Sequence, residues 1–289
     1  MANSGKHDGA TLEGMTKATA ATPPGRAQDF EAFLRSLDLP ENGLRYLEES
    51  MSRLVRTLML VPPGARSDAV LELGAYMQMT PALACLLGYG EVRGAYFGPL
   101  GQTDSKVSTI DGKEIFRCEV DLFDVERDRF PYEDGRFQTV LACEIIEHLV
   151  LDPMHMLLEI RRVLRPGGTL VLTTPNVTSF TSVSRILTQS GNPQVYSQYP
   201  NPEGEGRESE SPHVREYAPQ ELREAVESAG FEIISLVTAR AGSFDAEEIE
   251  ALLRANGYSG DLRGEQMYCT ALAGPDRPVT RYPSFLYDA

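Results

Sequence analysis

The chain has 289 residues, of which 42% are hydrophobic, and this is enough for the core of a globular domain. Its 42 acidic residues outnumber its 27 Lys and Arg residues and give a net charge of -15, which excludes nucleic acid as a principal partner because phosphate backbones bind to positive surfaces. The four cysteines are widely spaced and no run approaches the roughly 18 apolar residues of a membrane span, so we expect a cytoplasmic protein with reduced thiols and no membrane association.

The N-terminal part divides into two segments. Residues 1–26 are rich in Ala, Thr, Gly and Pro and show no periodicity, so we predict a disordered tail. From residue 29 to residue 60 the apolar residues recur at helical spacing, with a break at residues 40–43 and an end at residues 62–64. This pattern predicts a helical N-terminal cap over residues 27–64.

Residues 65–274 alternate short apolar runs with helical segments, which is typical of β-α units around a parallel sheet. Seven strands are predicted, at residues 69–73, 91–96, 115–120, 138–143, 169–173, 232–238 and 267–272. Helices are predicted at residues 80–87, 153–164 and 219–229. The chain is therefore predicted to be an α/β protein with a seven-stranded, mostly parallel sheet, helices on both faces and a helical N-terminal extension.

Two further segments stand out by composition. Residues 189–212 are full of Gly, Pro and Glu, and a loop of this length in a compact domain is usually a lid, a substrate-binding loop or disordered. Residues 275–289 include the aromatic run RYPSFLYD, which predicts a tail that docks on the domain.

Four segments, in this order and spacing, resemble class I S-adenosylmethionine-dependent methyltransferases of the small-molecule and sugar type. They read VLELGAYMQ, DLFDVERDRFPYEDGRFQTVLACEIIEHL, LLEIRRVLRPGGTLVLTTPN and HVREYAPQELREAVESAGFE, and they lie between about residues 65 and 240. The resemblance implies a Rossmann-like sheet, S-adenosyl-L-methionine as the cofactor and S-adenosylhomocysteine as the product. The glycine-rich loop of the family is degenerate here, because Tyr76 and Gln78 stand where the family has glycine.

The predicted cofactor-binding residues follow the ends of the predicted strands. Glu72 and Gly74 end the first strand, where open α/β sheets bind ligands, and Gly74 permits close backbone approach. Tyr96 replaces the family's ribose-binding carboxylate and can offer one hydrogen bond or a ring that stacks on adenosine. By resemblance, Asp121 binds the adenine amino group beside a backbone N–H of Leu122, unless it is only a helix cap or a solvated acid. The complete predicted set is Glu72, Gly74, Tyr76, Tyr96, Asp121, Leu122, Cys143 and Glu144.

The predicted catalytic residues are Glu147, His148 and His213. Methyl transfer needs an acceptor positioned in line, and an alcohol acceptor also needs its proton removed. By resemblance, the Glu147–His148 pair lies next to the substrate pocket, although a structural hydrogen bond is the alternative role for His148. The segment HVREY, which begins at His213, resembles a family segment that folds back over the site.

Aromatic and basic residues near the predicted lid are the expected contacts for the acceptor. The predicted substrate-binding residues are Tyr196, Tyr199, Arg215 and Tyr217. Asp152, Glu144 and Glu147 could offer oxygens to Mg²⁺, but their spacing matches no defined cage, so we predict no tightly bound metal.

Three functions are compatible with these motifs to different degrees. The favoured one is an S-adenosylmethionine-dependent methyltransferase that acts on a hydroxyl oxygen of a small molecule, with a sugar or glycosylated metabolite as the preferred acceptor. The alternative is a catalytically inactive binding or scaffold protein, which the altered Tyr76, Gln78 and Tyr96 favour. A nicotinamide-dependent oxidoreductase is disfavoured, because the chain lacks Gly-x-Gly-x-x-Gly and an acid at the end of the second strand.

Overall fold

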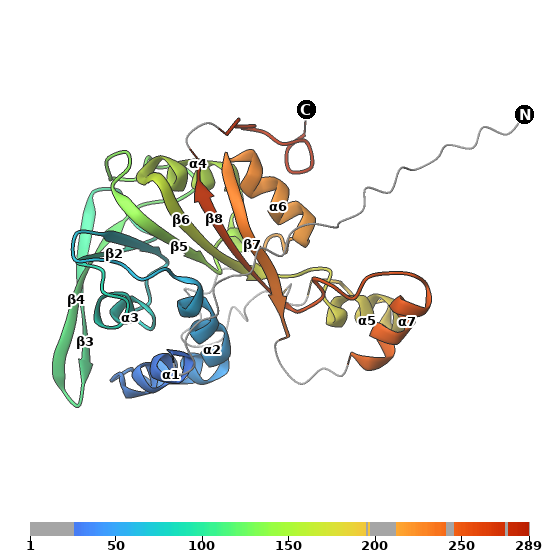
Figure 1. The fold of residues 1–289 in the computed structure, drawn as a ribbon, viewed down its shortest axis with the longest axis horizontal. Helices are drawn as coiled ribbons and strands as arrows, with labels where there is room; N and C mark the ends of the chain where they lie inside the picture. Colours follow the sequence, from blue (N-terminus) through green and yellow to red (C-terminus); the bar gives the residue numbers. More distant parts are fainter. Residues whose placement is uncertain (1–25, 195, 197–211, 241–245, 275–276, 289) are drawn as a thin grey trace, which may run out of the picture.

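The computed structural model describes residues 26–194, 196, 212–240, 246–274 and 277–288. These residues form an eight-stranded sheet with helices on both faces (Figure 1). The predicted disordered tail apart from Arg26, most of the predicted lid and Tyr199 lie outside the described residues. Within the described part of the chain, none of the helices combines the length and apolar composition that crossing a membrane requires.

The sheet is mostly parallel. Its strands are β1 (Ala69–Leu73), β2 (Glu91–Tyr96), β3 (Gln102–Ile110), β4 (Lys113–Leu122), β5 (Phe137–Cys143), β6 (Leu164–Pro175), β7 (Phe231–Ala239) and β8 (Gln266–Ala273), in the order β3-β4-β2-β1-β5-β6-β8-β7. Strands β1, β2, β4, β5 and β6 run parallel to one another, whereas β3 is antiparallel to β4, and β8 is antiparallel to β6 and β7. The predicted Rossmann-like α/β class is confirmed, with eight strands in place of seven.

The additional strand, β3, forms a hairpin with β4 at the edge of the sheet. Ile110 pairs with Lys113, and the two residues between them, Asp111 and Gly112, both have positive φ, at 52° and 72°. Two positive φ angles define a type I′ turn, for which Asp-Gly is a preferred pair. Because most side chains of β3 are polar and exposed, apolar periodicity did not predict this strand.

Helices cover both faces of the sheet and create two cores. α1 (Arg26–Ser36), α2 (Glu41–Leu60) and α3 (Thr80–Cys85) pack on one face, and α4 (Pro153–Val163) and α6 (Pro219–Ser228) pack on the other. Alternation along β1 sends Val70 into the first core and Leu71 and Leu73 into the second. An inner strand buried on both faces is the expected state of a parallel sheet.

Two helices that the sequence analysis did not predict pack against each other at one end of the sheet. α5 (Phe180–Gln189) and α7 (Glu247–Ala255) lie side by side in Figure 1 and share a small core around Phe180 and Ile249. Val183 and Leu253 extend this core.

The C-terminal segment, residues 277–288, lies against α4 and α6. Thr280 N donates to Ser228 O at 2.8 Å, and the Tyr287 hydroxyl donates to Asp152 Oδ1 at 2.5 Å. Arg281 forms an ion pair with the same aspartate. Since Asp152 also accepts a hydrogen bond from His155 N at the start of α4, its oxygens serve the packing of this segment.

Candidate functional site

The carboxyl ends of the five parallel strands lie at one edge of the sheet. The strand order reverses at β1, because β2 and β4 lie on one side of it and β5 and β6 lie on the other. Open α/β sheets bind ligands at such a switch point. The segments that follow β1 and β5, beginning at Gly74 and Glu144, therefore flank the candidate site.

The loop after β1 turns sharply at Gly74, whose φ is +66°. Ala75 N then donates to Ala95 O at 3.1 Å, which holds the loop across the end of β2. This approach requires Gly94, because a Cβ atom there would lie 2.8 Å from the Cβ atom of Ala75. Met77, with φ +70°, supplies a second left-handed residue without glycine. The loop thus keeps a tight turn despite its missing glycines.

Two tyrosines meet above the ends of β1 and β2. The Tyr96 hydroxyl donates to the Tyr76 hydroxyl at 2.9 Å, and the rings meet edge to face with centroids 5.2 Å apart. Lys106 Nζ lies 5.2 Å from the centroid of the Tyr96 ring. Phe97, the next residue along the chain, is 76% exposed. This end of the sheet therefore presents aromatic surface and phenol hydroxyls rather than a carboxylate.

Glu72 lies beneath this loop and is buried. Burial raises the pKa of its carboxyl from 4.5 to about 7, an effect that the nearby Thr80 hydroxyl only partly opposes. Its Oε2 atom has no hydrogen-bond partner among the described residues. Buried carboxyl oxygens in folded proteins nearly always have a partner, so Glu72 is a candidate contact for a bound group.

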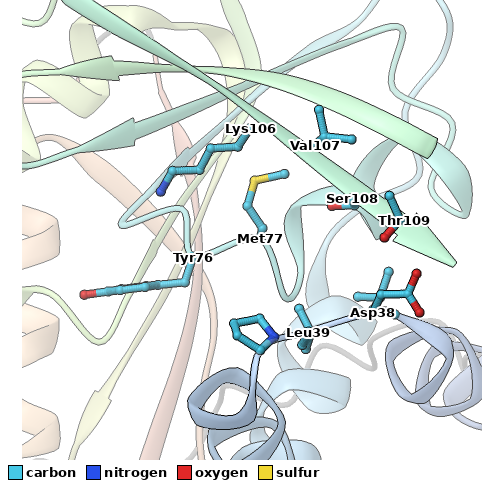
Figure 2. A pocket seen from close by; sticks show the side chains of 10 residues that line it. Asp38, Leu39, Tyr76, Met77, Lys106, Val107, Ser108 and Thr109 are labelled. Atoms are coloured by element: carbon cyan, nitrogen blue, oxygen red, sulfur yellow. The ribbon is translucent and has the colours of Figure 1, made fainter. Parts of the chain in front are cut away.

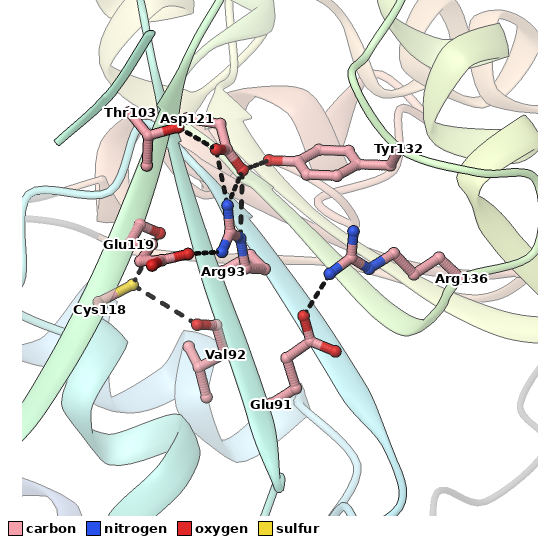
Figure 3. Close-up of polar contacts among 9 residues, drawn as sticks. All are labelled: Glu91, Val92, Arg93, Thr103, Cys118, Glu119, Asp121, Tyr132 and Arg136. Atoms are coloured by element: carbon pink, nitrogen blue, oxygen red, sulfur yellow. Dashed lines mark hydrogen bonds and ion pairs between the residues drawn. The ribbon is translucent and has the colours of Figure 1, made fainter. Parts of the chain in front are cut away.

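Asp121, the predicted adenine-binding residue, is instead part of an internal network (Figure 3). Its carboxylate accepts hydrogen bonds from Arg93 Nη2 at 2.6 Å, Thr103 Oγ1 at 2.8 Å and Tyr132 Oη at 2.8 Å. Burial alone would raise the pKa of Asp121, but these hydrogen bonds outweigh it and hold the pKa below the usual value. The prediction for Asp121 is corrected, because its oxygens are already used to join β2, β3 and β4.

Asp124 is a carboxylate after β4 that the sequence analysis missed. It lies beyond the last strand residue, Leu122, and its Oδ1 accepts a hydrogen bond from Glu126 N at 2.9 Å. Its side chain is 23% exposed, whereas that of Asp121 is 10% exposed. The segment DLFD contains both acids, and only the end of β4 distinguishes them.

Glu144 follows β5 with a positive φ of 53°. Its Oε1 accepts hydrogen bonds from Thr173 Oγ1 and Gln266 Nε2, both at 2.7 Å, and its Oε2 lies 3.6 Å from Arg53 Nη1. Arg53 comes from α2, so the N-terminal helices contribute to this end of the site. Burial raises the pKa of the neighbouring Cys143 thiol, which makes it a packing residue rather than a nucleophile.

The three predicted catalytic residues come together. Glu147 and His148 lie in η1 (Ile146–His148), a short 3-10 helix after β5, and the rings of His148 and His213 meet edge to face with centroids 4.6 Å apart. A carboxylate oxygen of Glu147 and a ring nitrogen of each histidine lie within 4.8 Å of one another. Glu147 is fully buried, and burial together with the charge of Glu144 raises its pKa well above the ordinary value.

Backbone hydrogen bonds bring His213 to this cluster. Val214 N and Arg215 N both donate to Glu147 O, at 2.8 Å and 3.1 Å. The Thr174 hydroxyl at the end of β6 donates to Glu147 Oε2 at 2.9 Å. The segment that begins at His213 therefore crosses η1 and is held by the backbone of Glu147 itself.

The predicted substrate-binding residues lie in different surroundings in the structure. Tyr196 lies at the cluster, with its ring centroid 5.2 Å from that of His213 and half of its side chain exposed. Arg215 Nη2 donates to Glu221 Oε1 at 2.6 Å, in the first turn of α6. Tyr217 is 1% exposed and belongs to the core. The predictions for Arg215 and Tyr217 are therefore corrected, because the Arg215 guanidinium is paired with Glu221 and the Tyr217 ring is buried in the core.

A separate cavity of about 300 Å³ lies between β3 and residues 37–40, the segment that joins α1 to α2 (Figure 2). Tyr76 and Met77 from the β1 loop line one side of it, and Lys106 to Thr109 of β3 line another. The cavity shares the tyrosine with the loop, but the Glu147–His148–His213 cluster is not among its lining residues. It is therefore a neighbour of the strand-end site rather than the site itself.

A family model described as "Methyltransferase domain" matches residues 44–236 of the chain, from within α2 to within β7. The chain belongs to this methyltransferase domain family. S-adenosylmethionine is the cofactor of the domain and S-adenosylhomocysteine is its product, as the sequence resemblance implied.

Solved structures similar to this methyltransferase domain share little sequence with it. An S-adenosylmethionine-dependent methyltransferase from Archaeoglobus fulgidus is 16% identical and covers 81% of this chain and 100% of its own, with a TM-score of 0.49. A chain of the complex between the Haloferax volcanii Trm112 methyltransferase activator and a methyltransferase is 19% identical and covers 85% of this chain and 98% of its own, with a TM-score of 0.47.

One curated relative is more similar over a short stretch. An uncharacterized 37.1 kDa protein in transposon TN4556 of Streptomyces fradiae is 43% identical over 77 residues, which cover 25% of this chain. The chain spans 21% of the length of that relative. The substrate of the methyltransferase domain is therefore inferred from the site itself.

The residues at the strand ends fit S-adenosylmethionine. Gly74 turns the loop backbone at the end of β1, and Oε2 of the buried Glu72 has no hydrogen-bond partner within the part of the chain that the structure describes. Tyr96 and the exposed Phe97 offer aromatic surface suited to an adenine ring. Asp124 can supply the carboxylate that Asp121 does not. We expect these residues to hold the cofactor beside Glu144.

Proposed function

We propose that this methyltransferase domain transfers a methyl group to a hydroxyl oxygen of a small molecule, with the acceptor bound at the Glu147–His148–His213 cluster. The observation that supports this proposal is the position of the cluster, directly after β5 at the switch point of the sheet. Imidazole is the side chain that exchanges a proton near neutral pH, and an alcohol must lose its proton to become a nucleophile.

The residues of the cluster have separate roles in this reaction. Bound S-adenosylmethionine supplies a methyl group on a sulfonium sulfur, and transfer breaks the carbon–sulfur bond, forms a carbon–oxygen bond and leaves the electron pair on sulfur. His148 and His213 flank the place where the acceptor hydroxyl loses its proton. Glu147 holds the segment that carries His213 through its backbone carbonyl, and the Tyr196 ring packs beside His213.

We propose a saccharide or glycosylated metabolite as the acceptor. The half-exposed Tyr196 ring beside His213 offers a flat surface on which a sugar ring can stack. The net charge of -15 suits a neutral or cationic acceptor better than a polyanion.

The second candidate function is binding without turnover. It is favoured by the loss of Asp121 to the internal network and by tyrosine in place of a carboxylate at the end of β2. Titration calorimetry with S-adenosylmethionine and S-adenosylhomocysteine, with NAD as the control, tests whether the cofactor binds, which methyl transfer requires. Micromolar binding of both sulfur compounds without NAD binding is expected, and a folded protein that binds neither would leave only the scaffold function.

A matched pair of histidine variants tests the proposed chemistry. His213→Gln is expected to lower kcat for an alcohol acceptor by about 100-fold or more, since general acid–base groups contribute about this much. His155→Gln is the control, because His155 lies in α4 with its Nε2 atom 2.9 Å from the Asp128 carbonyl oxygen. Equal activity of the two variants would contradict the role of the cluster.

A further inference from the structure

We propose that Glu147, His148 and His213 bind one divalent transition-metal ion, such as Zn²⁺ or Mn²⁺. Their three ligand atoms lie within 4.8 Å of one another. Ligands around one ion at bond lengths of about 2.0–2.2 Å are separated by roughly 3–4.4 Å, so small side-chain rotations complete the set. The sequence analysis predicted no metal because it considered only acids near η1, and the fold adds a histidine from a distant segment.

The first independent observation is the state of the Glu147 carboxylate. Its side chain is fully buried, and Oε2 accepts the hydrogen bond from Thr174. Oε1 has no hydrogen-bond partner among the described residues. A buried carboxylate oxygen without a partner is costly, and coordination of a cation is one of the few arrangements that satisfies it.

The second observation concerns the oxygens that face the two imidazoles. His148 Nδ1 lies 3.2 Å from the Pro212 carbonyl oxygen, and His213 Nδ1 lies 3.5 Å from Glu216 Oε1. Glu216 is itself 3% exposed, and its Oε1 accepts a hydrogen bond from Tyr196 N at 2.8 Å. Metal-binding histidines generally direct one ring N–H to a carbonyl or carboxylate, which leaves the lone pair of the other nitrogen for the metal. His148 has such an oxygen, whereas His213 Nδ1 is buried, makes no hydrogen bond among the described residues and has the Glu216 carboxylate 3.5 Å away.

The charges around the cluster also favour a cation. The charge of Glu144 acts on Glu147, and Glu216 lies 3.5 Å from His213, so three carboxylates gather near the cluster, with Arg53 as the cation that contacts Glu144 at 3.6 Å. A divalent ion would balance the remaining negative charge.

The donor set indicates which class of metal fits. Two imidazoles and one carboxylate suit Zn²⁺, Mn²⁺ or Fe²⁺, whereas Mg²⁺ and Ca²⁺ prefer oxygen ligands. Three protein ligands leave at least one coordination position open, as in catalytic rather than structural sites. The open position can receive a hydroxyl oxygen of the acceptor.

The use of this metal rests on the proposed function, but its binding does not. With the ion present, both imidazoles are ligands, and the acceptor hydroxyl becomes more acidic because a cation polarises it. Its proton then leaves to solvent water, and the methyl carbon forms its bond to the oxygen as its bond to sulfur breaks. The metal therefore replaces the histidines as the group that activates the acceptor.

The test measures metal binding directly on the full chain. The protein is stripped with EDTA, dialysed and titrated by calorimetry with ZnCl₂ and with MnCl₂ in the absence of S-adenosylmethionine. We expect one ion per chain for at least one metal. His148→Gln and His213→Gln are expected to weaken binding by about 100-fold or more, and Glu216→Gln by about 10-fold, since outer-shell changes cost about 10–100-fold.

His155→Gln is the matched control, and it should bind the metal as the unchanged protein does. Circular dichroism establishes that each variant is folded before titration. The proposal is overturned if the stripped protein binds neither metal, or if a folded His148→Gln or His213→Gln variant binds it as tightly as the control does.

A second titration separates this inference from the proposed function. S-adenosylmethionine is titrated into EDTA-treated protein, where binding is expected because Gly74 and Tyr96 are not metal ligands. Metal binding by a protein that methylates no hydroxyl acceptor would uphold the site and reject the proposed function. Methyl transfer that persists at full rate in EDTA-treated protein would reject the metal's proposed use.

Discussion

Asp121 and Glu147 are buried carboxylates near the carboxyl ends of two parallel strands, β4 and β5. They differ in the hydrogen bonds that their oxygens accept. Asp121 accepts hydrogen bonds from Arg93, Thr103 and Tyr132, and these lower its pKa. Glu147 Oε2 accepts one hydrogen bond, from the Thr174 hydroxyl. Burial and the charge of Glu144 raise the pKa of Glu147. The first carboxylate is committed to the fold, and the second has capacity left for a ligand.

This difference gives a physical criterion for separating structural acids from functional ones. Position at a strand end does not separate them, because both residues lie there. What separates them is whether cationic and hydroxyl donors compensate for desolvation. Glu72 resembles Glu147 in this respect, since it is buried and one of its oxygens has no hydrogen-bond partner in the described parts of the chain.

The largest expected effect is the loss of stability in Asp121→Asn. The change leaves the Arg93 guanidinium, whose side chain is 17% exposed, without its buried partner. Breaking one side of such a pair costs about 3–5 kcal/mol. Urea unfolding of the variant should show a free energy of unfolding lower by about this amount.

The control for Asp121 is the other acid that Arg93 contacts. Glu119 is 61% exposed at its side chain, so Glu119→Gln is expected to change the free energy of unfolding by less than about 0.5 kcal/mol. Similar losses of free energy of unfolding in both variants would show that the buried hydrogen bonds of Asp121 do not stabilise the fold. Asp121 and Glu147 could then not be distinguished as a structural and a functional acid.

The next largest effect is a pH dependence of stability that arises from Glu72. Its pKa rises from 4.5 to about 7 on folding, so between these values the folded protein holds a proton that the unfolded chain releases. The contribution of Glu72 to the free energy of unfolding is therefore fully present below pH 4.5. It is lost as the pH rises through about 7, and the loss is on the order of 3 kcal/mol. Denaturant unfolding at pH 5 and pH 8 should show the fall, and Glu72→Gln should reduce it by the share of Glu72, while the share of Glu147, whose pKa is also raised by burial, remains. A fall of the same size in Glu72→Gln would assign it to other groups.

The sequence predicted the general fold because the inner strands are buried on both faces and read as apolar runs. It missed β3, whose side chains are polar, although the Asp111–Gly112 pair was a usable hairpin signal. It also missed α5 and α7, which are amphipathic but bury their apolar sides mainly against each other.

The candidate site was predictable only where its residues follow strands directly. Glu147 and His148 were accessible to sequence reasoning because they come after β5. The hydrogen bonds of Asp121 could not be predicted from the sequence, since Arg93 lies 28 residues away and its contact with Asp121 depends on strand register. For the same reason, the burial of Tyr217 and the partner of Arg215 could not be predicted from local patterns.

A smaller effect is expected for Thr103→Val in β3. The substitution keeps the shape and β-propensity of the side chain but removes one donor to Asp121. Arg93 and Tyr132 still satisfy the carboxylate, so the free energy of unfolding should fall by only about 1 kcal/mol, the net value of one hydrogen bond. Urea unfolding measures this, and a loss as large as that of Asp121→Asn would mean that the hairpin itself had detached.

The smallest effect on stability, and the sharpest test of the comparison, is expected for Glu147→Gln. The glutamine carbonyl oxygen can still accept the Thr174 hydroxyl, and the change removes a carboxylate whose other oxygen has no hydrogen-bond partner among the described residues. Loss of an uncompensated buried charge offsets the cost of the new amide group, so the free energy of unfolding in EDTA at pH 8 should change by less than about 1 kcal/mol. Methyl transfer should nevertheless be lost, because the cluster no longer holds the Glu147 carboxyl group. A loss of stability as large as that of Asp121→Asn would instead place Glu147 with the structural acids, since the same measurement would then find both carboxylates committed to the fold.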